Sequence, residues 1–235
     1  MVIAQTMSEP IIGISSMATR HVLDELAGEY GRLSGQRVAI ESVGGVAAAR
    51  RVEEGEAFDV VVLASDAIER LAAAGRVAPG SRVDLARSGV AIAVASGAPR
   101  PDIGNEAGLR EAIVNARTIG YSTGPSGSYL LSLFERWGIA ERIASRIVQA
   151  PPGVPVGTLI ARGEVELGFQ QLSELMHLPG IDVIGALPDE IQITTVFSAA
   201  ICTASAKRDA AQALLSFLAS SQADATKLRH GMESA

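Results

Sequence analysis

The stretch Ile11-Ile-Gly-Ile-Ser-Ser-Met-Ala-Thr-Arg-His-Val-Leu-Asp-Glu-Leu-Ala-Gly-Glu-Tyr30 decides the fold class. The short β-branched run at 11–14 predicts a buried strand, and the apolar positions that recur with a helical period over 18–30 predict a helix. Two serines, Ser15 and Ser16, follow the strand directly. The stretch therefore predicts a strand that leads into a helix through a serine turn, which is the repeating unit of an α/β sheet.

The same alternation of short strands and longer helices continues along the whole chain. Because the two element types alternate throughout, we expect an α/β sheet layered by helices. The expected strands span residues 11–14, 37–41, 60–63, 90–95, 118–121, 166–169, 182–184 and 195–203. The expected helices span residues 18–30, 46–54, 67–74, 106–115, 128–137, 140–147, 157–162 and 207–220.

Composition limits the class of protein and the kinds of partner. With 235 residues, 48% of them hydrophobic and 20% charged, the chain can form one large globular domain or two lobes. A net charge of −6 and an aromatic content of 4% disfavour nucleic acid and anionic membranes as partners. A single cysteine and three scattered histidines without metal-ligand spacing give no metal site, so we expect neither a metal nor an organic cofactor.

The sequence contains no stretch that predicts a membrane span or a secretory signal. Its longest apolar runs fall well short of the roughly 18 residues that cross a bilayer. The first ten residues lack a basic n-region and an apolar h-region. We therefore expect a periplasmic protein if a signal peptide was removed, and a cytoplasmic protein otherwise.

Four predicted helices begin after small or hydroxyl-bearing residues. A strand that leads into a helix through such residues points free backbone N–H groups and a positive dipole end at an anion. Each turn taken singly is equally an ordinary N-cap, but four in succession favour an anion-binding crevice at the carboxyl ends of the strands. The turns contain Ser15 and Ser16; Gly44 and Gly45; Ser126, Gly127 and Ser128; and residues 153–155.

Three segments carry a resemblance to a known family. These are the serine turn at 11–17, the block Gly55-Glu-Ala-Phe-Asp-Val-Val-Val-Leu-Ala-Ser-Asp66 and the block Arg162-Gly-Glu-Val-Glu-Leu-Gly-Phe169. In order and over most of the chain, they resemble periplasmic molybdate-binding proteins, the type II solute-binding proteins of ABC transporters. The resemblance implies a two-lobed periplasmic-binding-protein type II fold with a hinge and an interlobe ligand cleft. It also implies an ABC transporter membrane component as a partner.

The resemblance implies lobe boundaries as well, with residues 10–86 plus 197–235 in the first lobe and 87–196 in the second. The chain departs from the family pattern at two ligand positions. Gly44 and Gly45 stand where the family has a serine, and Gln170 stands where it has a tyrosine, so two hydroxyl donors are lost. We therefore expect a small anion other than molybdate, favouring an organic di- or tricarboxylate.

A carboxylate ligand favours arginine counter-ions, because a guanidinium pairs with a carboxylate through two hydrogen bonds. Arg20, Arg50 and Arg51 follow two of the four turns, and we place them in the first helical turns. The alternative is that they belong to solvated helix faces. On this prediction Ser15, Ser16, the two glycines, the 126–128 turn and Gln170 complete the ligand site.

Within the family, the segment Phe169-Gln-Gln-Leu-Ser-Glu174 and the one at Phe197 resemble a branch that includes aconitate isomerase. That resemblance implies an allylic proton shift that needs no cofactor. Arg20, as the cation, and Tyr121, as the acid or base, are the catalytic candidates, with His21 and Glu41 as further titratable groups. Glu174 is interpreted as a helix cap.

Several functions remain open from the sequence. The favoured hypothesis is a solute-binding protein that clamps an organic carboxylate between two lobes. The alternatives are an aconitate isomerase, a molybdate- or tungstate-binding transport protein, and a cytoplasmic sensor of a small anion.

Overall fold

The computed structural model describes residues 9–235, which form two compact α/β units. The first unit contains the chain up to Ala86, Phe197–Arg229 and Ser234–Ala235. The second contains Arg87–Val196 and His230–Glu233. We had expected residues 230–233 in the first lobe, but they group with the second unit. The close approach of Gly231 to Met176 explains the difference, since a Cβ on Gly231 would lie 2.7 Å from the Met176 sulfur.

The sheet of the first unit is parallel at its centre. Strand β1 pairs in parallel with both β2 and β3, and β9 runs antiparallel to β3. The strand order is β2 (Val38–Val43), β1 (Ile11–Ser16), β3 (Val60–Ala64), β9 (Thr194–Ile201) and β4 (Val83–Ala95), and β4 and β9 both continue into the second unit.

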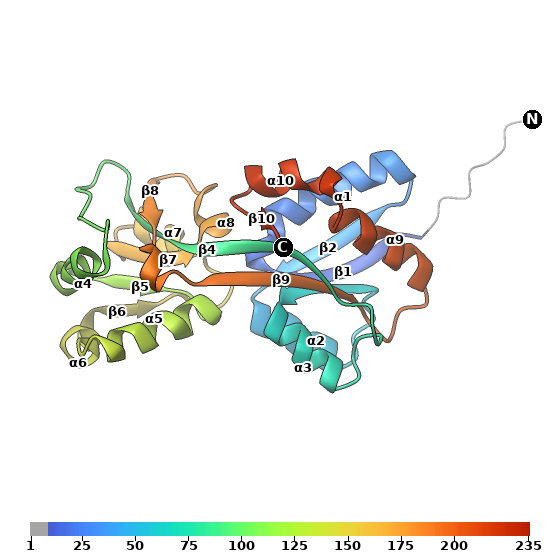
Figure 1. The fold of residues 1–235 in the computed structure, drawn as a ribbon, viewed down its shortest axis with the longest axis horizontal. Helices are drawn as coiled ribbons and strands as arrows, with labels where there is room; N and C mark the ends of the chain where they lie inside the picture. The colour runs from blue at the N-terminus through green and yellow to red at the C-terminus, as the bar shows by residue number, and fades with distance from the viewer. Residues whose placement is uncertain (1–8) are drawn as a thin grey trace, which may run out of the picture. The chain divides into compact units, whose positions relative to one another are not determined.

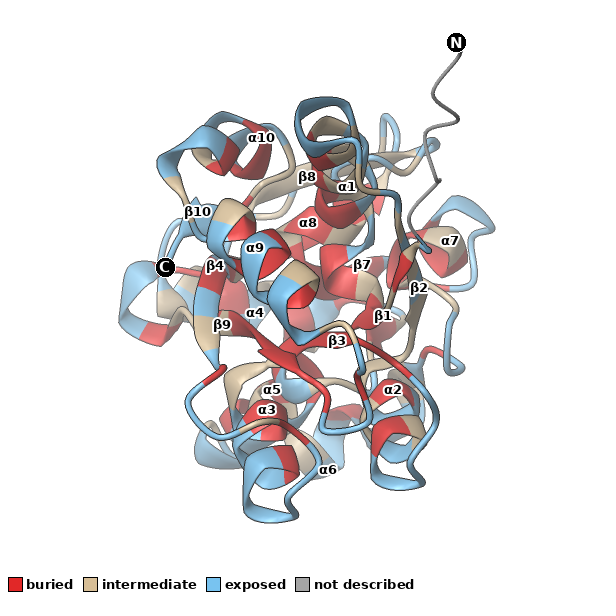
Figure 2. Ribbon diagram, turned by 90° about the vertical axis from the view of Figure 1, so that its right-hand side faces the viewer, coloured by how far each residue is buried: buried red, intermediate tan, exposed pale blue. Residues whose placement is uncertain are grey.

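Helices cover both faces of this sheet (Figure 1). On one side, apolar residues of β1 and β3 pack with α2 and α3, and Ile14, Val61 and Ile68 are fully buried there. Figure 2 shows the result, with buried strands at the centre and exposed outer sides on the helices. The helices are α1 (Arg20–Ser34), α9 (Arg208–Leu218) and α10 (Asp224–Arg229) on one face, and α2 (Gly45–Glu53) and α3 (Ser65–Ala73) on the other.

The second unit has a buried sheet with a core on each face. Because side chains alternate along a strand, Val90, Ile92 and Val94 of β4 join one core, while Ala91 and Ala93 join the other. Strands β5, β6 and β7 are parallel, and β4 runs antiparallel to β7 and β8. The strands are β5 (Ile119–Tyr121), β6 (Ile147–Gln149), β7 (Leu167–Gln171) and β8 (Ile181–Ala186).

Five helices complete the second unit. One core packs β4, β5 and β7 against α4, α5 and α6, and the other packs β4 against α7. Helix α7 sits so close to β7 that a Cβ on Gly168 would lie 2.5 Å from Ile160 Cδ1, so a glycine is needed there. The helices are α4 (Glu106–Asn115), α5 (Pro125–Arg136), α6 (Ala140–Ile143), α7 (Val156–Ala161) and α8 (Leu172–Leu175).

The short elements are where the sequence-based prediction is wrong. The helix expected at 140–147 ends at Ile143, continues as a 3₁₀ turn over Ala144–Arg146 and gives way to strand β6. Helices α8 and α10 and strand β10 (Glu233–Ser234) were not expected. The remaining 3₁₀ turns span Met17–Thr19, Asp189–Ile191 and Ser221–Ala223. In the described part of the chain, no helix is both long and apolar enough to span a membrane.

Candidate functional site

The carboxyl ends of the parallel strands in the first unit bring two predicted turns together. Strands β1 and β2 end side by side, with Ser16 in register with Val43. The Met17–Thr19 turn and then α1 follow β1, and α2 follows β2 after Gly44. Helix starts at this edge of an open α/β sheet present unpaired N–H groups to a ligand.

Ser16 is a buried hydroxyl without a protein partner. Its residue is 7% exposed, and among residues 9–235 no group hydrogen-bonds its Oγ. Although Ser16 stands at an N-cap position, its side chain makes no capping bond, in contrast to Asn105, which accepts from the Gly108 N–H at 2.9 Å. A buried hydroxyl without a partner is costly, so Ser16 keeps its place as a candidate ligand donor.

Ser15, the other serine of the turn, is satisfied within the unit. Its Oγ lies 2.7 Å from the Oγ of Ser42, and it also donates to the Ser16 carbonyl at 3.3 Å. These bonds tie β1 to β2 below the turn. Of the two predicted serines, Ser15 therefore holds the strands together, whereas the Ser16 Oγ has no bonding partner among residues 9–235.

The two glycines of the next turn lie beside Ser16. Gly45 is the first residue of α2, and a Cβ there would lie 3.6 Å from the Cβ of Ser16. A Cβ on Gly44 would meet nothing within 4 Å. The absence of side chains keeps the start of α2 accessible next to the Ser16 hydroxyl.

The predicted arginines separate into one near the turn and two away from it. Arg20 begins α1, and within residues 9–235 its exposed side chain makes a long ion pair, with Nε 3.9 Å from Asp24 Oδ2. Arg50 and Arg51 are in the last turn of α2, so the prediction that they lie in a first helical turn is wrong. Helix α2 begins at Gly45 and rises about 1.5 Å per residue, which carries both arginines away from its start.

Arg51 is committed to neighbours at the far end of α2. It pairs with Glu41 at 2.8 Å and with Glu56, and its guanidinium lies 5.1 Å from the centre of the Phe58 ring. Hydrogen bonds to Glu56 and Glu41 raise the pKa of Arg51, and the bond from Arg51 lowers the pKa of Glu41. Glu41 is therefore a poor base, and Arg50 is likewise paired, with Glu54 at 2.7 Å.

In the second unit, β5 and β7 end at the corresponding edge of the sheet, where Tyr121 is in register with Phe169. Tyr121 is 8% exposed and belongs to the core of this unit. A Cβ on Gly127 would lie 2.7 Å from the Tyr121 ring and 1.9 Å from the Ser122 carbonyl oxygen. The turn before α5 therefore folds onto Tyr121, and only glycine fits at position 127.

The serines of that turn differ in their surroundings. Ser126 is buried, and its Oγ lies 3.4 Å from the Oγ of Ser122. Ser128 is exposed, and its N–H donates to the Gly124 carbonyl at 3.3 Å. Ser126 and Gly127 are therefore both buried at the start of α5, whereas Ser128 faces solvent.

Gln170, near the end of β7, links the helices α7 and α8. It is 2% exposed, its Oε1 accepts from the Val156 N–H at 2.7 Å, and its Nε2 donates to Glu174 Oε2 at 2.6 Å. The amide therefore joins the first residue of α7 to a carboxyl group on α8. We had predicted Gln170 as a ligand donor, and in this structure both of its polar ends contact protein groups.

Glu174 is a functional candidate that the sequence analysis interpreted only as a helix cap. Burial raises the pKa of its carboxyl to about 7, against a smaller lowering by the Gln170 hydrogen bond. The residue is nevertheless partly exposed. Next to it, Ser173 is 3% exposed and its Oγ has no protein partner in the described range. The available signal was the position of both residues directly after the carboxyl end of β7.

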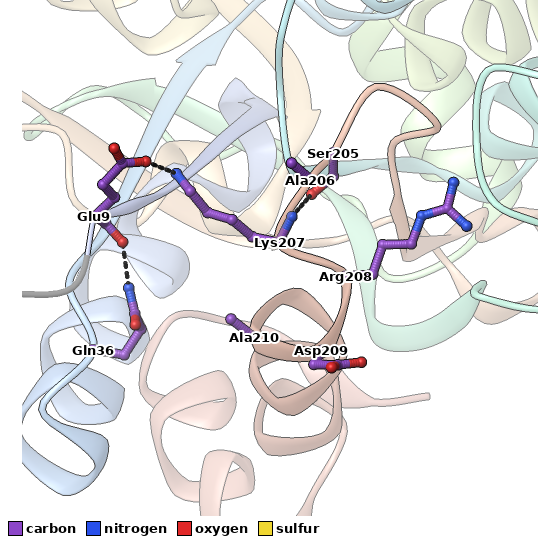
Figure 3. Close-up of a pocket in the computed structure, with 8 residues that line it drawn as sticks. All are labelled: Glu9, Gln36, Ser205, Ala206, Lys207, Arg208, Asp209 and Ala210. Carbon is purple, nitrogen blue, oxygen red and sulfur yellow. Dashed lines mark hydrogen bonds and ion pairs between the residues drawn. The ribbon is translucent and has the colours of Figure 1, made fainter.

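A separate pocket in the first unit lies near the amino ends of its strands, and Figure 3 shows the residues that line it. Lys207 Nζ donates to the Pro10 carbonyl at 2.8 Å and pairs with Glu9 at 3.4 Å. Asp59, which precedes β3, accepts from Ser205 Oγ at 2.7 Å and from the Ile12 N–H at 2.9 Å. These charges compensate one another and join the amino ends of β1 and β3 to the start of α9, so we assign them a structural role.

The titratable residues present do not form a metal centre. Over residues 9–235, no three histidine, cysteine, aspartate or glutamate side chains group as a set of metal ligands. The one cysteine, Cys202, is buried, and its burial raises the pKa of the thiol to about 12.

Comparison with known proteins places the chain in a family. The family model described as bacterial extracellular solute-binding protein matches residues 13–233. An aconitate isomerase from Pseudomonas sp. is 39% identical over 216 residues, which cover 89% of this chain and 82% of that protein.

Solved structures share the fold at lower identity. The periplasmic molybdate-binding protein of Azotobacter vinelandii superposes with a TM-score of 0.79 at 21% identity, over 94% of this chain and 98% of that one. The substrate-binding domain of a molybdenum ABC transporter, described as putative, from Clostridium difficile gives 0.74 at 14% identity, over 97% and 100%. The chain belongs to the bacterial extracellular solute-binding proteins, and its fold resembles that of molybdate-binding proteins.

Proposed function

We propose that this protein binds a tricarboxylate of the aconitate class and interconverts its trans and cis forms. The observation that supports this most is the 39% identity to an aconitate isomerase over 89% of the chain. From the sequence alone, binding without catalysis was the favoured hypothesis. The order changes here because a relative of this identity and coverage outweighs structural likeness at 21% identity or less.

The first unit supplies groups that suit a carboxylate. The Ser16 hydroxyl, the start of α2 at Gly45 and the half-exposed Arg20 all lie at or next to the turn that follows β1. A hydroxyl and helix N–H groups donate to carboxylate oxygens, and a guanidinium balances the charge. The expectation of a ligand held between two lobes stays a prediction.

The proposed reaction requires only proton transfer and stabilisation of negative charge. Moving the double bond of aconitate takes a proton from the methylene carbon and returns one to the far alkene carbon, while cationic groups stabilise the delocalised intermediate. No electron acceptor or co-substrate takes part. The chain needs a carboxylate-binding set and one group that exchanges a proton near neutral pH.

The direct test is to supply trans-aconitate to the purified protein and follow the cis isomer by NMR. We expect turnover, and we expect both aconitates to raise the unfolding temperature. A ligand at 100 times its dissociation constant adds about 2.7 kcal/mol to the free energy of unfolding. Molybdate, tungstate, sulfate, phosphate and citrate are the comparison ligands. Strong stabilisation by molybdate with no response to carboxylates would overturn the proposal.

Two arginine variants sharpen the binding test. Arg20→Ala should weaken aconitate binding at least tenfold, which corresponds to about 1.4 kcal/mol. Arg51→Ala is the matched control, because Arg51 is paired with Glu41 and Glu56 at the other end of α2. Equal losses of affinity in both variants would contradict the assignment of Arg20.

The second candidate function is solute capture for an ABC transporter, which family membership favours. In that case the protein is periplasmic and delivers a carboxylate to a membrane component. Stabilisation by aconitate without any turnover, together with recovery of the native protein in the periplasmic fraction, would favour transport over isomerisation.

A further inference from the structure

The second unit contains an ordered carboxyl group that the sequence did not assign to any chemistry. Glu174 stands in α8, three residues after the end of β7, and its Oε2 accepts the Gln170 Nε2–H at 2.6 Å. Gln170 cannot turn its amide over without penalty, because its Oε1 accepts the Val156 N–H at 2.7 Å. A backbone group of α7 therefore fixes the orientation of the glutamine, and the glutamine fixes one oxygen of the glutamate.

The location of Glu174 suits contact with a ligand. Strands β5, β6 and β7 are parallel, so the groups that follow their carboxyl ends gather at one edge of the sheet, the usual binding edge of an open α/β sheet. Glu174 is partly exposed, and Gln170 occupies only one of its oxygens. The other oxygen is left to carry or accept a proton.

The other titratable candidates fit the task less well. Glu41 is held in an ion pair with Arg51 that keeps it charged. Tyr121 is 8% exposed, with its ring packed on Gly127. Burial raises the pKa of Glu174 to about 7, where a carboxyl group both accepts and donates a proton with similar ease at neutral pH.

We infer that Glu174 is the proton-transfer group of the proposed isomerase and that Gln170 is its positioning residue, an inference that rests on the proposed function. The Glu174 carboxylate removes a proton from the methylene carbon of trans-aconitate. The C–H electron pair forms the new double bond to the central carbon, and the old double bond opens toward the far carbon. Glu174 then returns the proton to that carbon and is again a carboxylate. Both carbons are bonded to the same central carbon, so one carboxyl group serves both.

The test compares Glu174→Gln with wild type in turnover, binding and isotope exchange. Glutamine keeps an acceptor for Gln170 but carries no transferable proton. We expect kcat to fall at least 100-fold, within the range that general acid–base groups contribute, while aconitate still stabilises the variant. The protonated Glu174 carboxyl can exchange its proton with solvent before it returns one to the substrate. In D₂O the wild type should therefore place deuterium on the substrate carbons, and the variant should not.

A pH profile of kcat separates the role of Glu174 from that of a neighbouring histidine. His177 follows it by three residues, and its Nε2 lies 2.9 Å from Nδ1 of His230. His177→Gln is the matched control, which should keep the change of kcat near pH 7, whereas Glu174→Gln should abolish it. Gln170→Ala should lower kcat more than it changes KM and should shift the same limb of the profile. Glu174→Asp, which keeps an acid on a shorter arm, should retain intermediate activity.

The outcomes of these experiments test the role of Glu174 separately from the proposed isomerase function. Absence of turnover in wild type would overturn both. Turnover in wild type with unchanged kcat and deuterium exchange in folded Glu174→Gln would overturn the role of Glu174 alone. If Glu174→Gln did not fold, wild-type activity in folded Glu174→Asp with an unshifted pH profile would overturn it in the same way.

Discussion

Two serines that are adjacent in the sequence play different parts. Ser15 Oγ lies 2.7 Å from Ser42 Oγ and links two strands, whereas no group of residues 9–235 hydrogen-bonds the buried Ser16 Oγ. Successive residues of a strand point to opposite sides, so the turn aims only one hydroxyl at the helix starts. The pair therefore allows a structural serine to be compared with the serine proposed to bind the ligand, within the same turn.

Ser16→Ala should weaken aconitate binding by about 10- to 100-fold, because a hydrogen bond to a charged group contributes about 1.5–3 kcal/mol. Its stability should equal or slightly exceed that of wild type, since no protein bond is lost. Calorimetric titration and thermal unfolding measure the two effects. Ser15→Ala is the control and should lose about 1 kcal/mol of stability through the Ser42 contact. Unchanged affinity in Ser16→Ala would remove this residue from the site.

Glu174 should make stability depend on pH. Its pKa is raised from 4.5 to about 7 in the folded state, so the unfolded chain loses the proton first as the pH rises. The stabilisation is complete below pH 4.5 and is lost between about 4.5 and 7. Above that window the folded state holds a buried charge.

Glu174→Gln removes this cost. In urea titrations the variant should match wild type near pH 4.5 and exceed it by about 1–3 kcal/mol at pH 8. Taking the difference between the two proteins at each pH cancels the titration of the histidines. A difference that stays constant across the range would contradict the raised pKa.

At the scale of elements, the two ends of helix α2 lie in different surroundings. Gly45 at its start lies beside Ser16, while Arg50 and Arg51 at its end pair with carboxylates. The helix has nine residues and rises about 1.5 Å per residue, so its length keeps the arginines away from the Ser16 turn. The start of the helix is the part available to an anion.

Gly45→Leu should therefore abolish the ligand response while leaving the fold intact. A leucine side chain would grow from a position 3.6 Å from the Cβ of Ser16 and cover its hydroxyl. Replacing glycine inside a helix also restricts the unfolded chain, so stability should not fall. The measurement is the aconitate-induced shift in unfolding temperature. Gly44→Ala should retain the full shift, because a Cβ there meets nothing within 4 Å.

At the scale of the whole molecule, the chain enters its second unit more than once. Residues 87–196 form most of that unit, and His230–Glu233 join it after the chain has completed the last helix of the first. Met232 is 1% exposed within this returning segment. Met232 is therefore packed in the interior of the folded chain, whereas residues 233–235 are exposed.

Met232→Ala should lower the free energy of unfolding by about 2–5 kcal/mol, the usual cost of truncating a fully buried methionine. Urea denaturation measures the loss. Leu228→Ala, at a nearby side chain that is 64% exposed, should change stability by less than about 1 kcal/mol. Similar losses in both variants would show that the returning segment is not packed as described.

The sequence by itself determined the features that depend on local pattern. The β-branched run at 11–14 lies within β1, the helix expected at 18–30 overlaps α1 from Arg20 onward, and the helix expected at 106–115 spans those residues. The spacing of buried and exposed positions is set by the local geometry of a strand or helix, so these elements can be predicted without knowledge of long-range contacts. The family resemblance, carried by whole blocks, is confirmed by the match over residues 13–233.

Tertiary structure decided which polar residues are committed and which are available. Arg51 resembles Arg20 in the sequence, yet its partners Glu41 and Glu56 come from other segments. Glu174 was interpreted as a cap, but in the folded chain burial raises the pKa of its carboxyl to about 7. Its orientation is set by Gln170, which is held in turn by the Val156 N–H. Burial and hydrogen-bond partners are set by residues far apart in the chain, and for that reason local pattern does not contain them.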